Sequence, residues 1–353
     1  MINNIRLQNF RSYRDDSFEF DPGVNIIVGP NASGKTNLLE AVMVLAQGGS
    51  FRARDVDLLR FKAPWSRLDG DFDGRNRSLK LEPSPALLQK THLLDDQPFK
   101  RLSLERTEPI VFFEPNHLQL MTRGPEARRD YMDGLLLATI PSFRIINNGY
   151  RRALAQRNAL LKKGPREARQ QLFAWDVRLG ELGSQIAIAR QSLVDTLNKH
   201  LAKIYSQIAG RRSRLRVEYA SQFLVEGYAS RLVSRLEKTT ETDIQRGFTG
   251  HGPHREDFLF YLNNQPAGVS ASRGETRSLL LALKAIELKL VEKARDQKPI
   301  LLLDDVFSEL DGARRQALVQ LLADHQAIIT TTDADAAVEY FGTNHHLIPL
   351  TKN

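Results

Sequence analysis

Apolar and polar residues alternate with a period of two along much of the first third of the chain, which predicts half-buried β-strands. This alternation is seen at residues 5–7, 18–20 and 69–81. Unbroken apolar runs at residues 24–28 and 109–113 predict two further strands, buried on both faces. The first third of the chain is therefore expected to be rich in strands.

The apolar spacing changes to periods of three and four between about residues 125 and 236, which predicts helices. No heptad repeat continues for more than a few turns, so a long coiled coil is not expected. After residue 250 strands and helices alternate again. Apolar runs lie at residues 258–262, 299–303, 326–329 and 346–350, and a helical period covers residues 274–294.

This order of elements predicts an α/β fold in which two halves of one sheet domain flank a helical lobe. We expect a discontinuous α/β domain of residues 1–115 and 250–353, with residues 116–249 as the helical insert. In such folds the ligand site lies at the carboxyl ends of the parallel strands. Candidate chemistry is therefore sought directly after the apolar runs.

A phosphate-binding motif follows the apolar run at residues 24–28. It fits G-x-x-x-x-G-K-S/T and comprises Gly29, Pro30, Asn31, Ala32, Ser33, Gly34, Lys35 and Thr36. The glycines let the backbone curl so that its N–H groups point into a phosphate. Lys35 can reach the β/γ oxygens and assist catalysis, while the Thr36 hydroxyl can bind Mg²⁺. Residues 36–47 have a helical period, which completes the strand–loop–helix setting that this motif requires.

Two acids, Asp304 and Asp305, end the apolar run at residues 299–303 and give it the form of a Walker B strand. A parallel strand ends at the edge of the sheet where the phosphate loop also lies. Asp304 is expected to hold Mg²⁺, directly or through water. Asp305 is expected to orient or deprotonate the attacking water. ATP and Mg²⁺ are thus the predicted cofactors.

The helix expected at residues 274–294 is preceded by an S-x-G sequence. Ser272 and Glu275 fit an S-x-x-E capping box, and Gly274 lies between them. A capped helix start offers free N–H groups and a positive dipole end to an anion. In an ABC-type ATPase an S-x-G element at this place is the signature motif, which contacts the γ-phosphate of ATP held by another subunit. We therefore expect an ATP-dependent homodimer.

Two positions differ from the pattern of ABC transporters. Thr332 follows the strand expected at 326–329, where transporters usually place a His that senses the γ-phosphate. A hydroxyl can hydrogen-bond a phosphate but offers no imidazole proton chemistry. Asp305 is one methylene shorter than the usual Glu. Both differences predict slow hydrolysis, suited to a switch. Between these positions, residues 308–311 resemble a D-loop, a turn that faces the dimer partner.

Charge and composition point to a polyanionic partner. The net charge of +8 and the isoelectric point of about 9.6 favour nucleic acid first and an anionic membrane second. The absence of cysteine excludes disulfides and suits a reducing cytoplasm. Neither a signal-peptide core nor an apolar run of membrane-spanning length is found.

Basic residues are concentrated at residues 151–170 and 211–216. Each run fits either a solvated helix face or a surface that contacts phosphates, and the sequence leaves both open. The candidates for DNA contact are Arg52, Arg54, Arg151 and Arg152. The preferred form of DNA is not encoded in any of these patterns.

The chain resembles the bacterial RecF family nearly from end to end. The resemblance is carried by residues 7–13, 29–37, 50–52, 113–118, 128–129, 156–158, 252–257, 271–275 and 302–311. The strings Gly-Pro-His-Arg and Asp-Asp-Val-x-Ser-Glu-Leu-Asp are highly specific together. One departure is Glu275, where the family usually has Gln; because a carboxylate repels a γ-phosphate, no direct contact is assigned to it.

The resemblance implies the fold, the activity and the partners. It implies an ABC-type P-loop ATPase head similar to SMC heads, in which a short helical lobe replaces the long coiled coil. It also implies a DNA-binding protein that dimerises on ATP, hydrolyses slowly and acts in recombinational repair and replication restart. RecR and RecO are the implied partners, with RecA loading at gaps and SOS induction as linked processes. It further places Asn37 in the nucleotide site and Arg11 near adenine or ribose.

Two other functions compete with this reading. An ABC-type ATPase coupled to a TOPRIM-like nuclease would need a D-x-D pair for two metals, and residues 333–335 supply one. Such a pair also caps helices, and too little chain follows for a separate TOPRIM fold. An ATPase subunit of a transporter is the third candidate, but the helical insert is much longer than such subunits usually have.

Overall fold

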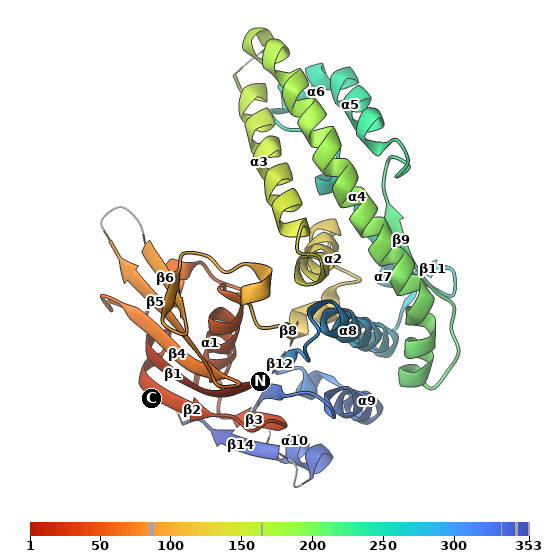
Figure 1. The fold of residues 1–353 in the computed structure, drawn as a ribbon. Helices are drawn as coiled ribbons and strands as arrows, with labels where there is room; N and C mark the ends of the chain where they lie inside the picture. Colours follow the sequence, from red (N-terminus) through yellow and green to blue (C-terminus); the bar gives the residue numbers. More distant parts are fainter. Residues whose placement is uncertain (85–87, 164, 333, 343–344, 352–353) are drawn as a thin grey trace. The chain divides into compact units, whose positions relative to one another are not determined.

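The computed structural model describes residues 1–84, 88–163, 165–332, 334–342 and 345–351 (Figure 1). The chain divides into two compact units. The first comprises residues 1–118 and 277–353, and the second comprises residues 119–276. Residues 250–276, which the sequence pattern assigned to the α/β domain, lie in the second unit, because the strand they contain pairs with a strand of that unit.

An antiparallel sheet in the first unit has the strand order β2-β1-β4-β5-β6-β7. Its strands are β1 (Ile2–Phe10), β2 (Tyr13–Glu19), β4 (Ser66–Phe72), β5 (Arg75–Pro83), β6 (Leu88–Leu94) and β7 (Gln97–Phe99). The hairpin expected around Asp73 and Gly74 is the β4–β5 connection, and both turn residues have positive φ. β6 and β7 carry little periodic signal and form by pairing, β6 with β5 and β7 with β6.

A parallel sheet in the same unit has the strand order β14-β3-β13-β12-β8. Its strands are β3 (Val24–Val28), β8 (Ile110–Phe113), β12 (Ile300–Asp304), β13 (Ala327–Thr331) and β14 (His345–Pro349). These are the apolar runs that the sequence predicted as buried strands. β13 lies at the centre of the sheet between β3 and β12, so the ends of these three parallel strands share one edge.

The helix α1 (Lys35–Gln47) packs against strands of both sheets. The sequence pattern predicts a single apolar face, but Val44 and Leu45 are buried as well as Leu38 and Leu39. Burial on nearly all sides follows from two sheets flanking one helix. The core cluster of this unit accordingly combines residues of α1 with residues of both sheets.

The other helices of the first unit lie later in the chain, apart from short 3₁₀ turns. They are the part of α8 (Arg273–Arg295) from residue 277 onward, α9 (Gly312–Leu322) and α10 (Ala334–Phe341), with η1 (Asp55–Leu58), η2 (Leu104–Arg106), η3 (Pro115–Gln119) and η5 (Phe307–Glu309). The carboxylate of Asp311 accepts the backbone N–H of Arg314 and caps α9, directly after the residues predicted as a D-loop.

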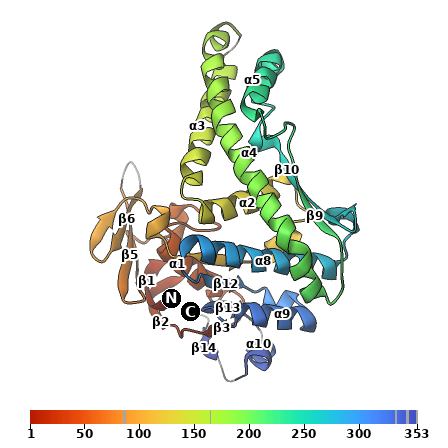
Figure 2. The same ribbon diagram turned by 45° about the vertical axis from the view of Figure 1, so that its right-hand side comes forward.

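The second unit contains the predicted helical lobe and a small sheet. Its helices are α2 (Pro125–Thr139), α3 (Phe143–Leu161), α4 (Pro165–Ala209), α5 (Tyr228–Lys238), α6 (Thr240–Arg246), η4 (Pro253–Arg255) and α7 (Ala267–Ser270). The two long helices α3 and α4 lie side by side (Figure 2). No helix among the described residues is both long and apolar enough to span a membrane.

The small sheet corrects the prediction that residues 125–236 are helical throughout. β9 (Leu215–Ala220), β10 (Asp257–Leu262) and β11 (Gln265–Pro266) have the order β11-β10-β9. β9 and β10 pair antiparallel over six residues each. Arg216 of the second basic run therefore lies in a strand, where Val217 and Tyr219 alternate toward the core.

Candidate nucleotide-binding site

The phosphate loop connects β3 to α1 through backbone conformations that favour glycine. Gly34, which precedes α1, has φ of +103°. A Cβ at Gly34 would lie 2.9 Å from the Tyr13 hydroxyl, and one at Gly29 would lie 2.6 Å from the Leu350 carbonyl oxygen. Gly34 therefore has neither the φ nor the space for a side chain, and Gly29 lacks the space. The loop's N-terminal and C-terminal glycines hold the curl that the motif predicts.

The Lys35 side chain folds back over the loop. Its Nζ donates to the carbonyl oxygens of Gly29 at 2.6 Å and of Pro30 at 3.0 Å. Burial lowers the pKa of Lys35, whereas Asp305 and Asp304 act in the opposite direction. The Lys35 ammonium group is thereby held against the loop backbone, where it interacts electrostatically with the carboxylates of Asp305 and Asp304. Nearby, the buried Ser33 hydroxyl has no hydrogen-bond partner among the described residues.

Asp304 at the end of β12 contacts the first turn of α1. The Thr36 hydroxyl lies 2.9 Å from Oδ1 and 3.1 Å from Oδ2 of Asp304. Thr330 of β13 donates to the same Oδ1 at 2.8 Å. Hydroxyl and carboxylate oxygens are the ligands that Mg²⁺ prefers. The residues present therefore fit the predicted Mg²⁺ site, because two oxygen donors from distant parts of the sequence meet at one point.

Asp305 follows directly and has a left-handed backbone conformation, with φ of +49°. Its backbone N–H donates to the Thr330 hydroxyl at 2.9 Å, and the Ser308 hydroxyl lies 3.1 Å from its Oδ1. The pKa of Asp305 is raised, mainly because the carboxyl group is partly buried. The hydrogen bond from Ser308 lowers this pKa, and the neighbouring charge of Asp304 raises it further. Thr330 thus holds both acids. Thr332, the predicted contact of the γ-phosphate, is exposed directly after β13.

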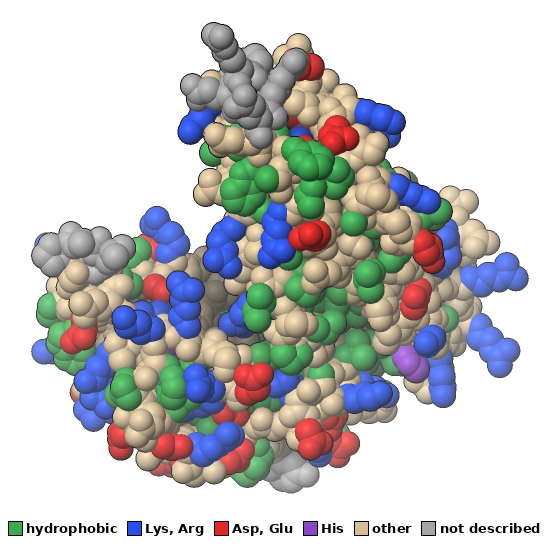
Figure 3. All heavy atoms as spheres, turned by 45° about the horizontal axis from the view of Figure 1, so that its top comes forward, with side chains coloured by type: hydrophobic (Ala, Val, Ile, Leu, Met, Phe, Trp, Pro, Cys, Tyr) green, Lys and Arg blue, Asp and Glu red, His purple; other side chains and the backbone are tan. Residues whose placement is uncertain are grey.

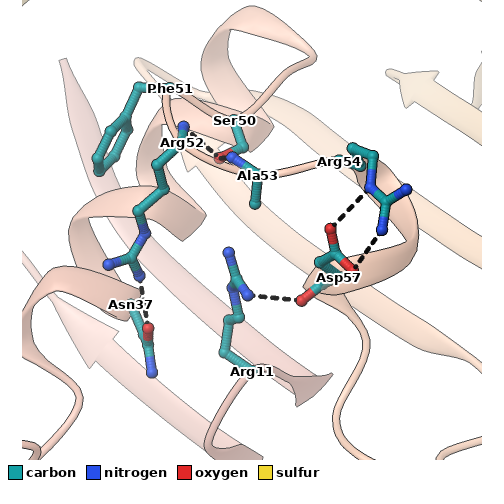
Figure 4. Close-up of a pocket in the computed structure, with 8 residues that line it drawn as sticks. All are labelled: Arg11, Asn37, Ser50, Phe51, Arg52, Ala53, Arg54 and Asp57. Carbon is teal, nitrogen blue, oxygen red and sulfur yellow. Dashed lines mark hydrogen bonds and ion pairs between the residues drawn. The ribbon is translucent and has the colours of Figure 1, made fainter.

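A second part of the site is an open pocket of about 860 Å³ beside α1 (Figure 4). It is lined by Arg11, Asn37, Ser50, Phe51, Arg52, Ala53, Arg54 and Asp57. Arg11 and Asn37, both predicted nucleotide contacts, therefore line one cavity. The Arg11 guanidinium donates to the Asp57 carbonyl at 2.6 Å, and Arg52 donates to the Asn37 side chain at 2.7 Å.

A buried carboxylate that the sequence analysis did not single out holds this pocket together. Glu40 of α1 is fully buried and accepts hydrogen bonds from Arg11, Arg52 and Ser50 at 2.6–3.0 Å. Burial on its own would raise the pKa of Glu40, but these donors outweigh it and the pKa is lowered. Its position on the polar side of the predicted amphipathic helix gave no signal of burial.

The predicted signature element belongs to the second unit. Ser272 and Glu275 form the capping box: Ser272 N–H donates to the Glu275 carboxylate at 2.8 Å, and Glu275 N–H donates to the Ser272 hydroxyl at 3.3 Å. Glu275 also forms an ion pair with Arg211. The backbone hydrogen bond from Ser272 is the main cause of a lowered pKa of Glu275. Gly274 lies in the first turn of α8, directly after Arg273.

The four candidates for DNA contact are exposed, and one of them, Arg52, is also engaged in an ion pair with Glu40, with 37% of its side chain exposed. Arg151 and Arg152 of α3 are exposed, and the Arg54 side chain is 83% exposed. Arg157 of the first basic run is fully buried, and it pairs with Asp176 and Asp243 of the second unit. Arg157 therefore belongs to the core of that unit rather than to a phosphate-binding surface. Figure 3 shows Lys and Arg side chains spread over the visible face, with acidic side chains between them.

The nuclease alternative depended on residues 333–335. Asp333 lies outside the described residues, as does the side chain of Asp335. Across the part of the chain that the structure describes, no group of three or more His, Asp or Glu side chains is placed to hold a metal ion.

Comparison with known proteins adds relatives and a shared fold. A protein family described as an AAA domain matches residues 4–76. The chain is 36% identical to a DNA replication and repair protein RecF of Moorella thermoacetica over 355 residues, covering 99% of this chain and 95% of the relative.

Two solved structures show the same fold. A structure of the recombination mediator protein RecF with ATP in the RecFOR pathway has a TM-score of 0.84 and 30% identity, covering 94% of this chain and 92% of that chain. A crystal structure of an Smc head bound to the C-winged helix domain of ScpA has a TM-score of 0.51 at 14% identity, covering 94% and 90%, and shares the fold alone.

Proposed function

This chain belongs to the RecF family of DNA replication and repair proteins, and from that premise we propose that it is an ATP-gated DNA-binding switch. ATP favours a homodimer that holds DNA, and slow hydrolysis releases it. The observation that carries the proposal is the contact of Thr36 with Asp304, which joins the phosphate loop to the Walker B strand. Without that contact, the loop alone would support only phosphate binding.

The nucleotide occupies the two adjoining parts of the site in the first unit. Loop N–H groups and Lys35 bind the β- and γ-phosphates. Arg11 and Asn37, which line the open pocket, take the adenosine end. Mg²⁺, when bound to Thr36 and Asp304, neutralises phosphate charge. The RecF structure with ATP supports the choice of nucleotide, because that relative shares the fold over nearly its whole length.

Hydrolysis depends on Asp305. Its carboxylate accepts a hydrogen bond from the attacking water and orients it toward the γ-phosphate. The raised pKa of Asp305 favours proton uptake, yet its side chain is shorter than the Glu of faster ABC ATPases. Thr332 supplies a hydroxyl without proton chemistry. Both features support slow turnover that DNA stimulates.

Dimerisation couples ATP to DNA. The capped start of α8 in one subunit offers Ser272 and the N–H groups around Gly274 to the γ-phosphate held by Lys35 of the other. The γ-phosphate thus bridges the subunits, and its loss shifts the population back to monomers. Membership of the family supports a wider role in the cytoplasm, together with RecR- and RecO-type mediators. The processes served are RecA loading at gaps, SOS induction and replication restart.

DNA binding measured with and without ATP, at two salt concentrations, tests the switch. Wild type is expected to bind DNA more tightly with ATP and less tightly at high salt. Lys35→Met is expected to lose the ATP effect. Asp305→Asn is expected to keep it and to release DNA more slowly, because hydrolysis is blocked.

Lys298→Met is the matched control. Lys298 is an exposed lysine that precedes β12 at the amino edge of the parallel sheet, away from the carboxyl edge where the site lies. It should behave as wild type. DNA binding that is indifferent both to ATP and to Lys35 would refute the switch.

A further inference from the structure

A tight turn in the first unit presents an aromatic side chain to solvent. Residues 60–63 connect η1 to β4, and the Ala63 N–H donates to the Arg60 carbonyl at 2.9 Å. The Arg60 N–H donates to the Asn9 carbonyl of β1 at 2.8 Å, so the turn is anchored to the sheet. Lys62 has φ of +62°, which is costly for a residue with a side chain. The backbone therefore fixes Phe61 at the tip of the turn.

Three exposed apolar side chains lie within residues 56–65, a segment that includes this turn. Phe61 is 84% exposed, Val56 54% and Trp65 38%. Five large hydrophobic side chains are exposed among the described residues of the first unit, and these three account for most of them. Single exposed apolar residues are ordinary, but three within ten residues of a fixed segment suggest a contact surface.

The charge around Phe61 is positive and uncompensated. Arg60 and Lys62 flank the ring, and among the described residues neither pairs with an acid. The nearby acids are already engaged, since Asp55 pairs with Lys90 at 2.6 Å and Asp57 pairs with Arg54 at 3.1 Å. The Lys62 ammonium lies 5.3 Å from the centroid of the Phe61 ring. The turn thus offers a flat apolar ring beside two cations that pair with no acid among the described residues.

We propose that the turn at residues 60–63 stacks on an unpaired base of single-stranded DNA. Phe61 takes the base, and Arg60 and Lys62 take the neighbouring phosphates. A ligand that is both flat and anionic matches this chemistry, because every base has a π-face and every nucleotide carries a phosphate. Paired bases inside a duplex are stacked on one another and present no free face to the ring. The inference rests on the proposed DNA-binding function and names the form of DNA that this turn recognises.

An anionic membrane is the competing occupant, since aromatic and basic side chains also mark interfacial anchors. Membrane binding scales with the apolar area that can be buried, and stable anchoring uses an amphipathic helix or a lipid chain. Residues 60–63 carry one large apolar side chain that is exposed, Phe61, and Trp65 beyond the turn is less exposed, at 38%. The small apolar area beside these cations therefore favours a nucleotide.

Binding of a labelled oligothymidylate and of a duplex of equal length, in the presence of ATP, tests the inference. Phe61→Ala is expected to weaken single-strand binding between about fivefold and about a hundredfold, the range for loss of one stacked base. Duplex binding should be unchanged. Phe61→Tyr keeps the ring and should bind as wild type. Circular dichroism should show all variants folded, because the side chain is exposed.

Salt dependence separates stacking from charge. Phe61→Ala should leave the slope of log affinity against log salt unchanged, whereas Lys62→Ala should reduce its magnitude by about 0.7, the value for one single-strand phosphate. Leu347→Ala is the matched control, because it shortens an exposed apolar side chain of the same unit that lies outside residues 56–65. It should leave single-strand affinity intact.

Three results would overturn the inference. Phe61→Ala could leave single-strand binding unchanged, or it could weaken duplex and single-strand binding equally. It could also abolish binding to vesicles containing phosphatidylglycerol while DNA binding stays intact, which would assign the turn to a membrane. In each of these cases the proposed switch still holds if wild type binds duplex DNA in an ATP-dependent manner. Wild type that binds no DNA at all refutes the switch and this inference together.

Discussion

At the scale of single residues, Glu40 is the side chain on which the pocket beside α1 depends. It is fully buried in α1 and joins Arg11 of one loop to Arg52 of another. Neither arginine is fully buried, with 21% and 37% of their side chains exposed. A carboxylate inside a core requires such partners, because an unpaired buried charge is strongly destabilising. Glu40 therefore fixes both the protein's stability and the shape of the pocket.

We expect Glu40→Gln to lower the free energy of unfolding by roughly 3 kcal/mol at neutral pH, the low end of the range for breaking a buried pair. The partial exposure of Arg11 and Arg52 keeps the cost near that end. The folded-state pKa of Glu40 lies below its unfolded value. The stabilisation is thus complete above the unfolded pKa of about 4.3 and is lost as pH falls through the folded pKa.

Denaturant unfolding of wild type and Glu40→Gln between neutral pH and about pH 3 measures this difference. The two curves should converge at the acid end. Asp15→Asn removes an exposed partner of Arg6 and should change stability little. A gap between wild type and Glu40→Gln that stays constant with pH would contradict the role assigned to the carboxylate.

Residue types and spacing predicted the residues expected to carry the chemistry of the site, but not the residues that hold them in place. The phosphate loop, Asp304 and Asp305 could be identified because their motifs are local strings with one chemical purpose. Glu40 and Thr330 could not, because their importance arises from partners that are distant in the sequence. Thr330 illustrates this, since its hydroxyl touches Asp304 and the backbone of Asp305 across two neighbouring strands.

At the scale of elements, the start of α8 combines a helix cap with a proposed phosphate contact. The Glu275 carboxylate accepts the Ser272 N–H, so the chain's own anion occupies a donor that a γ-phosphate would use. Arg211 pairs with the same carboxylate and partly neutralises it. The cap thus stabilises the helix, and we expect it to compete with the proposed ATP-dependent dimerisation.

Glu275→Gln is expected to lower the ATP concentration needed for half-maximal dimerisation by roughly two- to tenfold. A neutral amide still completes the capping box but no longer repels the γ-phosphate. Analytical ultracentrifugation across an ATP titration measures the effect. Ser272→Arg should abolish dimerisation while the monomer still binds ATP.

Glu218→Gln is the control for the charge change. Glu218 is also paired with an arginine in the second unit, Arg216 of β9, but it lies away from the helix start. It should dimerise as wild type does. Weaker dimerisation of Glu275→Gln would show that the carboxylate assists the γ-phosphate contact. ATP-dependent dimerisation of Ser272→Arg would contradict the proposed γ-phosphate contact through Ser272.

At the scale of the whole molecule, each of the two units has a polar interior network of its own. In the second unit, the buried Arg157 of α3 pairs with Asp176 of α4 at 2.6 Å and with Asp243 of α6 at 2.7 Å. Thr249 adds a hydroxyl to the same guanidinium at 3.0 Å. Residues far apart in the sequence are thereby tied together within the helical lobe, independently of the nucleotide site.

We expect Arg157→Met to destabilise the second unit by about 3 to 5 kcal/mol, because two carboxylates stay buried without their cation. ATP binding by the first unit should survive. Hydrogen exchange followed by mass spectrometry should show lost protection in α3, α4 and α6, with α1 and the parallel sheet unchanged.

Arg178→Met is the matched control, since Arg178 lies on the same helix α4 in an exposed pair with Glu181. Its exchange pattern should equal that of wild type. Equal loss of protection in both units after Arg157→Met would show that they unfold as one body.

The sequence by itself determined the motifs of the site and most of the strands. Unbroken apolar runs predicted the strands of the parallel sheet, whereas the run at residues 258–262 forms the antiparallel strand β10. A phosphate loop works only between a strand and a helix, so local patterns were sufficient for it. The capping box at Ser272 and Glu275 was equally local, and the structure contains it.

Only the tertiary structure decided which elements belong together. β9 and β10 are separated by two helices, and their pairing moves residues 250–276 into the second unit. Two sheets bury α1, which makes Glu40 an interior residue. One basic run of the sequence supplies both the exposed Arg151 and the buried Arg157. Burial and pairing are set by neighbours that lie far away along the chain, and no local period records them.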